Sequence, residues 1–225
     1  MANYKKKITK KSEKLLIKSF IKLLKQSISE KSKLNNRFSL VLTGGSSPIN
    51  LYKGLSQSNI NWANVDFFIG DERFVSSKSD FSNFKLVNNN LLKKIHVNKK
   101  QIYLINANKK KISQSTQDYK NKIIKYFKDK EINFDLTLLG MGNDGHIASL
   151  FSRDKKIFSA ELVRSIKRID FNRITIGLNV INKSKKIVLW LPNKKKFNYF
   201  NSLKTKTIKP VKLLKKNKLY LFNCN

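Results

Sequence analysis

An aspartate and a histidine separated by one glycine form the segment of this sequence best suited to acid–base chemistry. Asp144, Gly145 and His146 stand together, and His96 is the other histidine of the chain. An imidazole titrates near pH ~6.5, so it can take or give a proton at neutral pH. The glycine turn presents His146 to solvent or to a ligand, and Asp144 could orient its ring. We therefore expect His146 to act as a general base or acid, and His96, in a lysine-rich turn, to be structural or solvated.

A run of glycines and hydroxyl residues from Thr43 to Pro48 has the composition of a phosphate-binding loop. Gly44 and Gly45 allow the backbone to come close to a ligand and to adopt positive φ angles. Ser46 and Ser47 add hydroxyl groups, and the free N–H groups at the start of a helix attract anions. The alternative is a plain glycine turn in which Ser47 caps the following helix.

Three consecutive charged residues, Asp71, Glu72 and Arg73, follow a second apolar run. A guanidinium binds a carboxylate or a phosphate through two hydrogen bonds, which a lysine does less well. Arg73 is therefore a candidate substrate-binding residue, with Asp71 beside it. A local ion pair at the protein surface is the alternative interpretation.

We find no pattern that indicates a cofactor or a metal. Gly140, Gly142 and Gly145 spell the G-x-G-x-x-G of dinucleotide-binding proteins, but they come late in the chain and no acidic strand end follows at the usual distance. No set of His, Cys and acidic residues has metal-ligand spacing. The residues thus indicate a metal-free enzyme without a cofactor, acting on a small phosphorylated substrate.

The elements that must position these segments alternate along the chain. We expect strands over 38–42, 65–69, 102–105, 134–139, 187–191 and, as a last edge strand, 219–222. Helical spacing marks 15–24, 48–55, 81–92, 119–127 and 192–203. This order predicts an α/β fold, a single domain over 1–225 with a mostly parallel sheet and helices on both faces. We expect 152–172 to be irregular. The three segments follow strands, at the edge of the sheet where such folds bind ligands.

Composition limits the possible partners. The 225 residues include 48 Lys+Arg and 14 Asp+Glu, a formal net charge of +34, yet 40% are hydrophobic, which excludes a wholly disordered polycation. No apolar run approaches the ~20 residues of a membrane span, so we expect a cytoplasmic protein with no membrane partner. Most of the cations are lysines spread along the chain, rather than arginines clustered with aromatics. We therefore expect no nucleic-acid partner, although a basic nucleic-acid-binding protein stays open as an alternative.

Several ordered blocks, covering most of the chain, resemble the 6-phosphogluconolactonases of the glucosamine/galactosamine-6-phosphate isomerase superfamily. The most specific runs from Phe134 to Phe151 and contains Gly140-Met141-Gly142-Asn143-Asp144-Gly145-His146. The others are 38–48, 61–73, Ser82-Asn83, Arg173-Ile174-Thr175, Lys196 and 210–214. Agreement of several blocks in order is more specific than any single motif.

The resemblance implies a fold like that of sugar-phosphate isomerases and deaminases, and hydrolysis of 6-phosphogluconolactone to 6-phosphogluconate in the oxidative pentose phosphate pathway. It implies that His146 activates the attacking water, that Asp144 supports it, and that Arg73 and Asp71 belong to the catalytic pocket. It further implies that the substrate and its phosphate are held by Gly44, Gly45, Ser46, Ser47, Arg173 and Lys196. Among Lys194, Lys195 and Lys196, the choice of Lys196 rests on spacing.

Glucosamine-6-phosphate deaminases are the nearest alternative, since they share the fold and the Asp-Gly-His motif. They typically carry Phe-Asn-Glu-Pro after the histidine and Asp-Glu-Tyr in the second block. This chain has Ser149-Leu150-Phe151 and Asp71-Glu72-Arg73 at these places. The sequence therefore favours the lactonase.

Overall fold

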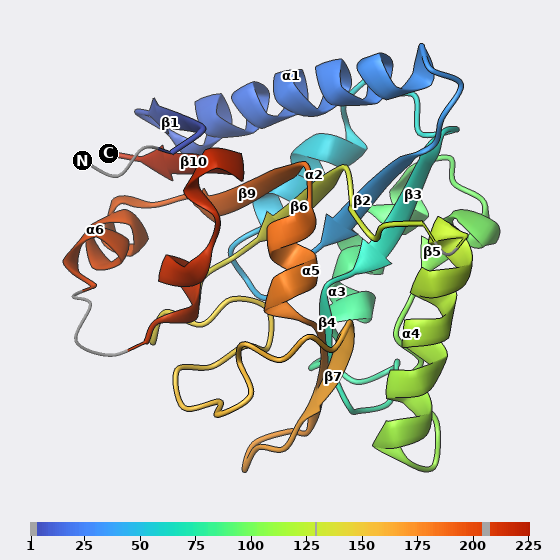
Figure 1. The fold of residues 1–225 in the computed structure, drawn as a ribbon. Helices are drawn as coiled ribbons and strands as arrows, with labels where there is room; N and C mark the ends of the chain where they lie inside the picture. Colours follow the sequence, from blue (N-terminus) through green and yellow to red (C-terminus); the bar gives the residue numbers. More distant parts are fainter. Residues whose placement is uncertain (1–3, 129, 204–207) are drawn as a thin grey trace.

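The structure, a computed structural model, describes residues 4–128, 130–203 and 208–225 and contains two sheets (Figure 1). The larger sheet has the strand order β1-β10-β9-β6-β2-β3-β5, and its neighbouring strands run parallel. Its strands are β1 (Lys6–Lys10), β2 (Phe38–Leu42), β3 (Val65–Ile69), β5 (Ile102–Tyr103), β6 (Leu136–Leu139), β9 (Lys186–Leu191) and β10 (Leu219–Cys224). The smaller, antiparallel sheet has the order β4-β8-β7, with β4 (Asp71–Arg73), β7 (Val163–Ile166) and β8 (Arg173–Ile176).

Helices cover both faces of the larger sheet, with α1, α2 and α3 on one face and α4, α5 and α6 on the other (Figure 1). They are α1 (Glu13–Ser32), α2 (Ile49–Ser56), α3 (Asn83–Asn90), α4 (Ile112–Phe127), α5 (Leu178–Lys183) and α6 (Lys194–Ser202). Short 3₁₀ turns occupy Leu92–Lys94, Lys99–Gln101, Pro210–Leu213 and Lys216–Lys218. This arrangement confirms the predicted α/β fold with a mostly parallel sheet. Within the described ranges no helix has the length and apolar character needed to span a bilayer.

The core forms where the apolar runs predict it. All residues of β2 and β3 are buried, as expected for strands covered on both faces. Helix α1 packs its apolar stripe on the sheet, where Phe20 meets Trp190 and Phe222 edge-on with ring centroids 6.0 and 5.7 Å apart. The hydroxyl of Ser12 accepts a hydrogen bond from the Leu15 amide and caps this helix.

The edge of the larger sheet differs from the prediction. The segment 219–222 is not an edge strand, because β10 lies between β9 and β1. The edge strand on this side is β1, a lysine-rich strand that pairs with the C-terminal strand β10, and β5 is the other edge strand. Edge strands often carry lysines, which prevent pairing with another chain. The sequence of β1 therefore has no apolar run, and it resembles a basic tail.

The smaller sheet is the second difference. The segment 152–172, expected to be irregular, contains β7, and the charged segment after Gly70 is not a loop but β4. Both strands are too short for their sequences to show a clear periodicity. The strand β4 matters for function, because alternate side chains of a strand share a face. Several predicted element ends also shift. β5 ends at Tyr103, β6 begins at Leu136 and α3 begins at Asn83, after the N-cap Ser82, while α1 and α4 are longer than predicted.

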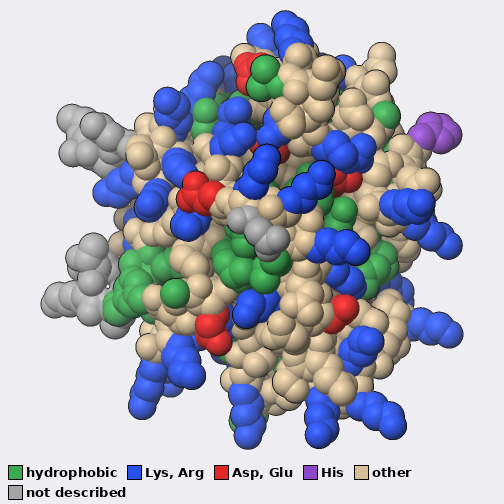
Figure 2. Space-filling model, turned by 45° about the vertical axis from the view of Figure 1, so that its right-hand side comes forward, with side chains coloured by type: hydrophobic (Ala, Val, Ile, Leu, Met, Phe, Trp, Pro, Cys, Tyr) green, Lys and Arg blue, Asp and Glu red, His purple; other side chains and the backbone are tan. Residues whose placement is uncertain are grey.

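The excess positive charge is distributed over the surface. Figure 2 shows lysine and arginine side chains scattered over the whole of one face, with few acidic residues among them. His96 is exposed, which agrees with the prediction that it is structural or solvated.

Candidate active site

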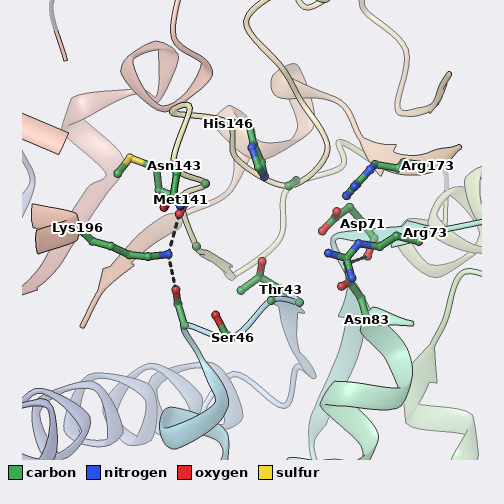
Figure 3. A pocket seen from close by; sticks show the side chains of 16 residues that line it. Thr43, Ser46, Asp71, Arg73, Asn83, Met141, Asn143, His146, Arg173 and Lys196 are labelled. Carbon is green, nitrogen blue, oxygen red and sulfur yellow. Dashed lines mark hydrogen bonds between the residues drawn. The ribbon is translucent and has the colours of Figure 1, made fainter. Parts of the chain in front are cut away.

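A cavity of about 250 Å³ lies where β2 and β6 of the larger sheet end, beside β4 and β8 of the smaller one (Figure 3). Nine of the ten predicted site residues line it, and Asp144 contacts one of them from outside. The lining residues are Thr43, Gly44, Gly45, Ser46, Ser47, Asp71, Arg73, Asn83, Gly140, Met141, Gly142, Asn143, His146, Ala148, Arg173 and Lys196. The structure thus brings the three predicted segments together.

The glycine-rich loop after β2 is shaped by two requirements. Gly44 lies against Asn83, and a Cβ atom at Gly44 would be 1.9 Å from Asn83 Oδ1. Gly45 has φ +79°, which favours glycine. The hydroxyl of Tyr52 holds the start of the loop, since it donates to the Thr43 carbonyl at 2.5 Å. These contacts fix the conformation of the loop, and its residues Thr43, Gly44 and Gly45 line the cavity.

Lys196 extends from the first turn of α6 to the glycine-rich loop. Its Nζ donates to Ser47 Oγ at 2.6 Å and to the Met141 carbonyl at 3.0 Å (Figure 3). Burial lowers the pKa of Lys196 below its ordinary value. Ser47 therefore does not cap helix α2 through its side chain, the alternative considered above, and Pro48 is the N-cap residue instead. Lys194 and Lys195 are exposed, so Lys196 is the member of the lysine run that reaches the cavity.

His146 lies on another wall of the cavity, on the loop after β6. Its Nδ1 is 2.5 Å from Asp144 Oδ1, and because an ionised carboxylate only accepts hydrogen bonds, this contact favours the tautomer with the proton on Nδ1 and Nε2 as the acceptor. Burial raises the pKa of Asp144, but the charge and hydrogen bonds of His146 outweigh this effect and lower the pKa below its ordinary value. The ring of Phe151 packs against the imidazole with centroids 4.7 Å apart. Asp144 and Phe151 thus hold the imidazole of His146 at the wall of the cavity.

Two arginines lie side by side on neighbouring strands of the smaller sheet. Arg73 on β4 lies directly opposite Arg173 on β8, and both line the cavity. Side chains of directly opposed strand residues project to the same face, where like charges repel. Asp71 lies on this face too, and its Oδ2 accepts a hydrogen bond from Ser149 Oγ at 2.6 Å. The arrangement favours binding of an anion between or beside the two guanidinium groups.

Glu72 belongs to the scaffold and not to the cavity. Its carboxylate accepts hydrogen bonds from the Ser82 hydroxyl and from the amides of Arg73, Asn83 and Phe84, at 2.7 to 2.9 Å. It therefore ties β4 to the first turn of α3. Burial raises the pKa of Glu72, although these hydrogen bonds act in the opposite direction. Strand geometry explains why Asp71 and Arg73 reach the cavity and Glu72 does not.

Several residues of the site are missed by inspection of the motifs. Asn83 is buried and donates from Nδ2 to the Asp71 carbonyl at 2.8 Å, which joins α3 to β4. Ser149 and Phe151 hold Asp71 and His146, respectively. Their position within the same blocks as the predicted residues is the one signal in the sequence. In the described part of the chain, no group of three or more His, Cys, Asp or Glu side chains is arranged to hold a metal ion.

The cavity therefore combines a proton acceptor, three cations and a loop that exposes its backbone. His146 stands between Lys196 on one side and the pair Arg73 and Arg173 on the other (Figure 3). A phosphorylated molecule can bind to such cations while a second part of it lies beside the imidazole. The chemistry that this geometry allows is proton transfer at an anionic substrate.

Comparisons with known proteins agree with this geometry. Residues 11–221 match the family model described as glucosamine-6-phosphate isomerases/6-phosphogluconolactonase. The chain is 28% identical over 164 residues to a 6-phosphogluconolactonase of Thermotoga maritima, with 71% of each chain covered. It is 30% identical over 176 residues to a 6-phosphogluconolactonase of Helicobacter pylori, which covers 76% of this chain and 74% of the relative.

Solved structures show the same fold. The crystal structure of the Thermotoga maritima 6-phosphogluconolactonase matches with a TM-score of 0.84 at 22% identity, over 97% of this chain and 99% of that one. A monomeric glucosamine-6-phosphate deaminase matches with a TM-score of 0.79 at 20% identity, over 98% and 97% of the two chains. The fold is thus common to both activities, and the choice between them depends on sequence relatives and on the site.

Proposed function

Because the chain belongs to the glucosamine-6-phosphate isomerase/6-phosphogluconolactonase family, we propose that it hydrolyses 6-phosphogluconolactone to 6-phosphogluconate. The observation that carries this proposal is the His146–Asp144 pair at the wall of a cavity whose other walls carry Lys196, Arg73 and Arg173. The curated relatives quoted above are 6-phosphogluconolactonases, and the chain covers more than two thirds of each. They support the lactonase over the deaminase.

His146 starts the reaction by removing a proton from water. While its Nδ1–H donates a hydrogen bond to Asp144, the imidazole accepts the proton of the water at Nε2, and the water oxygen attacks the lactone carbonyl. A tetrahedral intermediate forms, the bond between the carbonyl carbon and the ring oxygen breaks, and the imidazolium returns its proton to that oxygen. The products are a carboxylic acid, which ionises at neutral pH, and a free hydroxyl. A lactone is an activated ester, so the reaction needs no covalent intermediate.

The cations on the walls bind the substrate and stabilise charge. Arg173, Lys196, Ser46 and Ser47 hold the phosphate, together with the backbone of the glycine-rich loop. Arg73 lies beside the reacting part of the substrate, where a guanidinium stabilises developing negative charge. Asp71, which is held by Ser149, accepts hydrogen bonds from hydroxyl groups of the substrate and so orients it.

Glucosamine-6-phosphate deamination is the alternative function. The structural match to a deaminase is at 20% identity and bears on the fold alone. At the position after the His146 loop, where deaminases typically carry Phe-Asn-Glu-Pro, this chain has Ser149, which is engaged with Asp71. Purified protein incubated with glucosamine-6-phosphate should release no ammonia, while 6-phosphogluconate should form from the lactone faster than in the absence of protein. Ammonia release without lactone hydrolysis would contradict the proposal.

We also propose that the protein acts in the cytoplasm and without a nucleic-acid partner. A phosphorylated sugar is charged and does not cross a bilayer unaided, so the enzyme must share a compartment with its substrate. The cavity fits a small ligand, and the cations that line it are accounted for by a phosphate. A filter-binding assay with duplex DNA at physiological salt should show no saturable binding.

A further inference from the structure

Asp170 holds the guanidinium of Arg173 from outside the cavity. It lies in the loop between β7 and β8, and its carboxylate accepts hydrogen bonds from Arg173 Nη2 and, at 2.9 Å, from Arg168 Nε. Arg173 lines the cavity, whereas neither Asp170 nor Arg168 does. Arg173 therefore contacts both the substrate cavity and a carboxylate of the protein itself.

The position of Arg173 explains why it needs a negative partner. Arg173 is buried and lies directly opposite Arg73, and in the described part of the chain the Nε atoms of both are buried without a hydrogen-bond partner. Like charges opposed in this way destabilise a strand pair. Asp71 shares this face and accepts a hydrogen bond from Ser149, whereas the ion pair of Arg173 is with Asp170. Asp170 thus supplies negative charge to Arg173 when the cavity holds no anion.

We propose that Asp170 is an internal counter-anion that competes with the phosphate of the substrate for Arg173, and so weakens anion binding in the cavity. This inference rests on the proposed function, because the competing ligand is the phosphate of the lactone. A phosphate dianion carries more charge than a carboxylate and can replace Asp170 at Arg173. A sugar without a phosphate cannot, so Asp170 also favours phosphorylated over neutral substrates.

Arg168 gives the displaced carboxylate a second partner. Its Cζ atom lies 4.0 Å from the centre of the Phe151 ring, a cation–π contact that fixes the guanidinium near Asp170. When phosphate occupies Arg173, Asp170 keeps its hydrogen bond from Arg168 and stays paired. The cluster of Arg168, Asp170 and Arg173 can therefore exchange partners without leaving a charge unpaired. At 38% exposure, Asp170 also has room to move away from Arg173.

Equilibrium binding of inorganic phosphate to the intact protein, measured by calorimetry at low ionic strength, tests this competition. Asp170→Asn should lower the Kd about three- to tenfold, as expected for loss of a partly exposed charged competitor. Asp118→Asn is the control, because it removes the same charge from a surface pair with Lys122 on α4, and it should leave the Kd unchanged. An unchanged or higher Kd in Asp170→Asn would overturn the proposal, since a carboxylate that merely positions Arg173 predicts weaker binding.

A second variant makes the opposite prediction and remains informative if Asp170→Asn does not fold. Arg168→Gln removes the alternative partner of Asp170, so Asp170 should hold Arg173 more tightly and the Kd for phosphate should rise roughly threefold or more. Lys167→Gln is its control, because Lys167 is an exposed neighbour and the same charge is lost. Equal effects of the two glutamine variants, or tighter binding in Arg168→Gln, would refute the competition.

Kinetics separate this inference from the proposed function. With 6-phosphogluconolactone as substrate, Asp170→Asn should lower KM and leave kcat unchanged, whereas a purely structural role would lower kcat. If wild type hydrolyses no lactone but the phosphate Kd shifts as described, the proposed function fails and the role of Asp170 stands. If lactone is hydrolysed and the phosphate Kd does not shift, or if phosphate binds neither wild type nor Asp170→Asn, the role of Asp170 is refuted.

Discussion

The imidazole of His146 lies so close to Gly142 that no side chain fits between them. A Cβ atom at Gly142 would be 2.1 Å from Cε1 of the ring and 2.3 Å from Nδ1. The two residues are also joined through the backbone, since the Gly142 amide donates to the His146 carbonyl at 2.9 Å. Gly142 and Phe151 thus both lie against the imidazole, and together they limit the orientation of the ring.

The first prediction follows from the close approach of Gly142 to the imidazole. Gly142→Ala should displace the imidazole and lower kcat by about 10²–10³, within the range that a positioned base contributes. Gly140→Ala is the matched control, because a Cβ atom there meets no atom within 4 Å, and its effect should be much smaller. Steady-state kinetics and thermal unfolding of both variants check this. Equal loss of activity in the two variants would contradict this prediction, because it would show that any substitution in the loop lowers kcat, whether or not it contacts the imidazole.

The second prediction concerns the hydrogen bond between His146 and Asp144. Asp144→Asn should lower kcat roughly 10- to 100-fold, part of the ~10²–10⁴ that a general base contributes, because an amide no longer fixes the proton on Nδ1. KM should change little, since Asp144 does not line the cavity. Kinetics over a range of lactone concentrations separate the two constants. A rise in KM at constant kcat would show that Asp144 binds substrate instead.

The third prediction concerns Lys196 and its neighbour Lys195. Lys196→Ala should raise KM roughly 10- to 100-fold, the effect of losing a hydrogen bond of ~1.5–3 kcal/mol to a charged group. Lys195→Ala should have no such effect, because Lys195 is exposed. Similar KM values in the two variants would argue against a phosphate contact of Lys196.

The lowered pKa of Lys196 adds a pH dependence to this contact. Burial favours the neutral amine, so the lysine loses its charge at a lower pH than an exposed lysine does. KM for the phosphorylated lactone should therefore rise with pH before the ordinary lysine range near ~10.4 is reached. Since lactones hydrolyse spontaneously at alkaline pH, binding of inorganic phosphate is the better measurement. A phosphate affinity that stays constant up to that range would contradict the assignment.

The fourth prediction concerns stability. Asp135 is buried just before β6, where its carboxylate accepts hydrogen bonds from Lys31, Lys185 and Ser39 at 2.9 to 3.0 Å. Asp135→Asn should cost about 2–4 kcal/mol of unfolding free energy at pH 7, the range for breaking a buried charged network. Asp118→Asn, in a partly exposed pair on α4, should cost less than about 1 kcal/mol. Urea unfolding at pH 7 measures both.

The same carboxylate predicts acid sensitivity. Burial raises the pKa of Asp135, but the hydrogen bonds from Ser39 and the two lysines have a larger, opposite effect. The pKa therefore lies below its ordinary value. A lowered folded-state pKa stabilises the protein above the unfolded pKa near ~3.9, and the stabilisation is lost as the pH falls through the folded value. The difference between wild type and Asp135→Asn should therefore shrink below about pH 4. A difference that stays constant down to pH 2.5 would contradict this.

The larger sheet was predictable because its central strands are short apolar runs ended by glycine, such as 38–42 and 65–69. β1 was not, since an edge strand needs no apolar run and its lysines resemble a tail. β4 and β7 were not predictable either, because strands of three or four residues take their structure from pairing with β8 and not from local periodicity. Tertiary pairing decided these elements.

The candidate site was predictable to the extent that function requires unusual residues in loops. Asp144, His146 and the two glycines of the loop after β2 stand out by type and spacing alone. Asp170 and Asn83 could not be found in this way, because their importance comes from contacts with Arg173 and Gly44 that only the folded chain creates. Glu72 likewise points to the other face of β4 from Asp71 and Arg73, and no local sequence pattern predicts this strand.

Hydrolysis of 6-phosphogluconolactone by wild type and His146→Ala, measured above the spontaneous background, tests the central claim most directly. We predict that wild type accelerates hydrolysis and that His146→Ala, folded and still binding inorganic phosphate, loses about 10²–10⁴ of kcat. Retention of wild-type turnover by His146→Ala would contradict the assignment of His146 as the general base. Absence of any acceleration by wild type would contradict the proposed function itself.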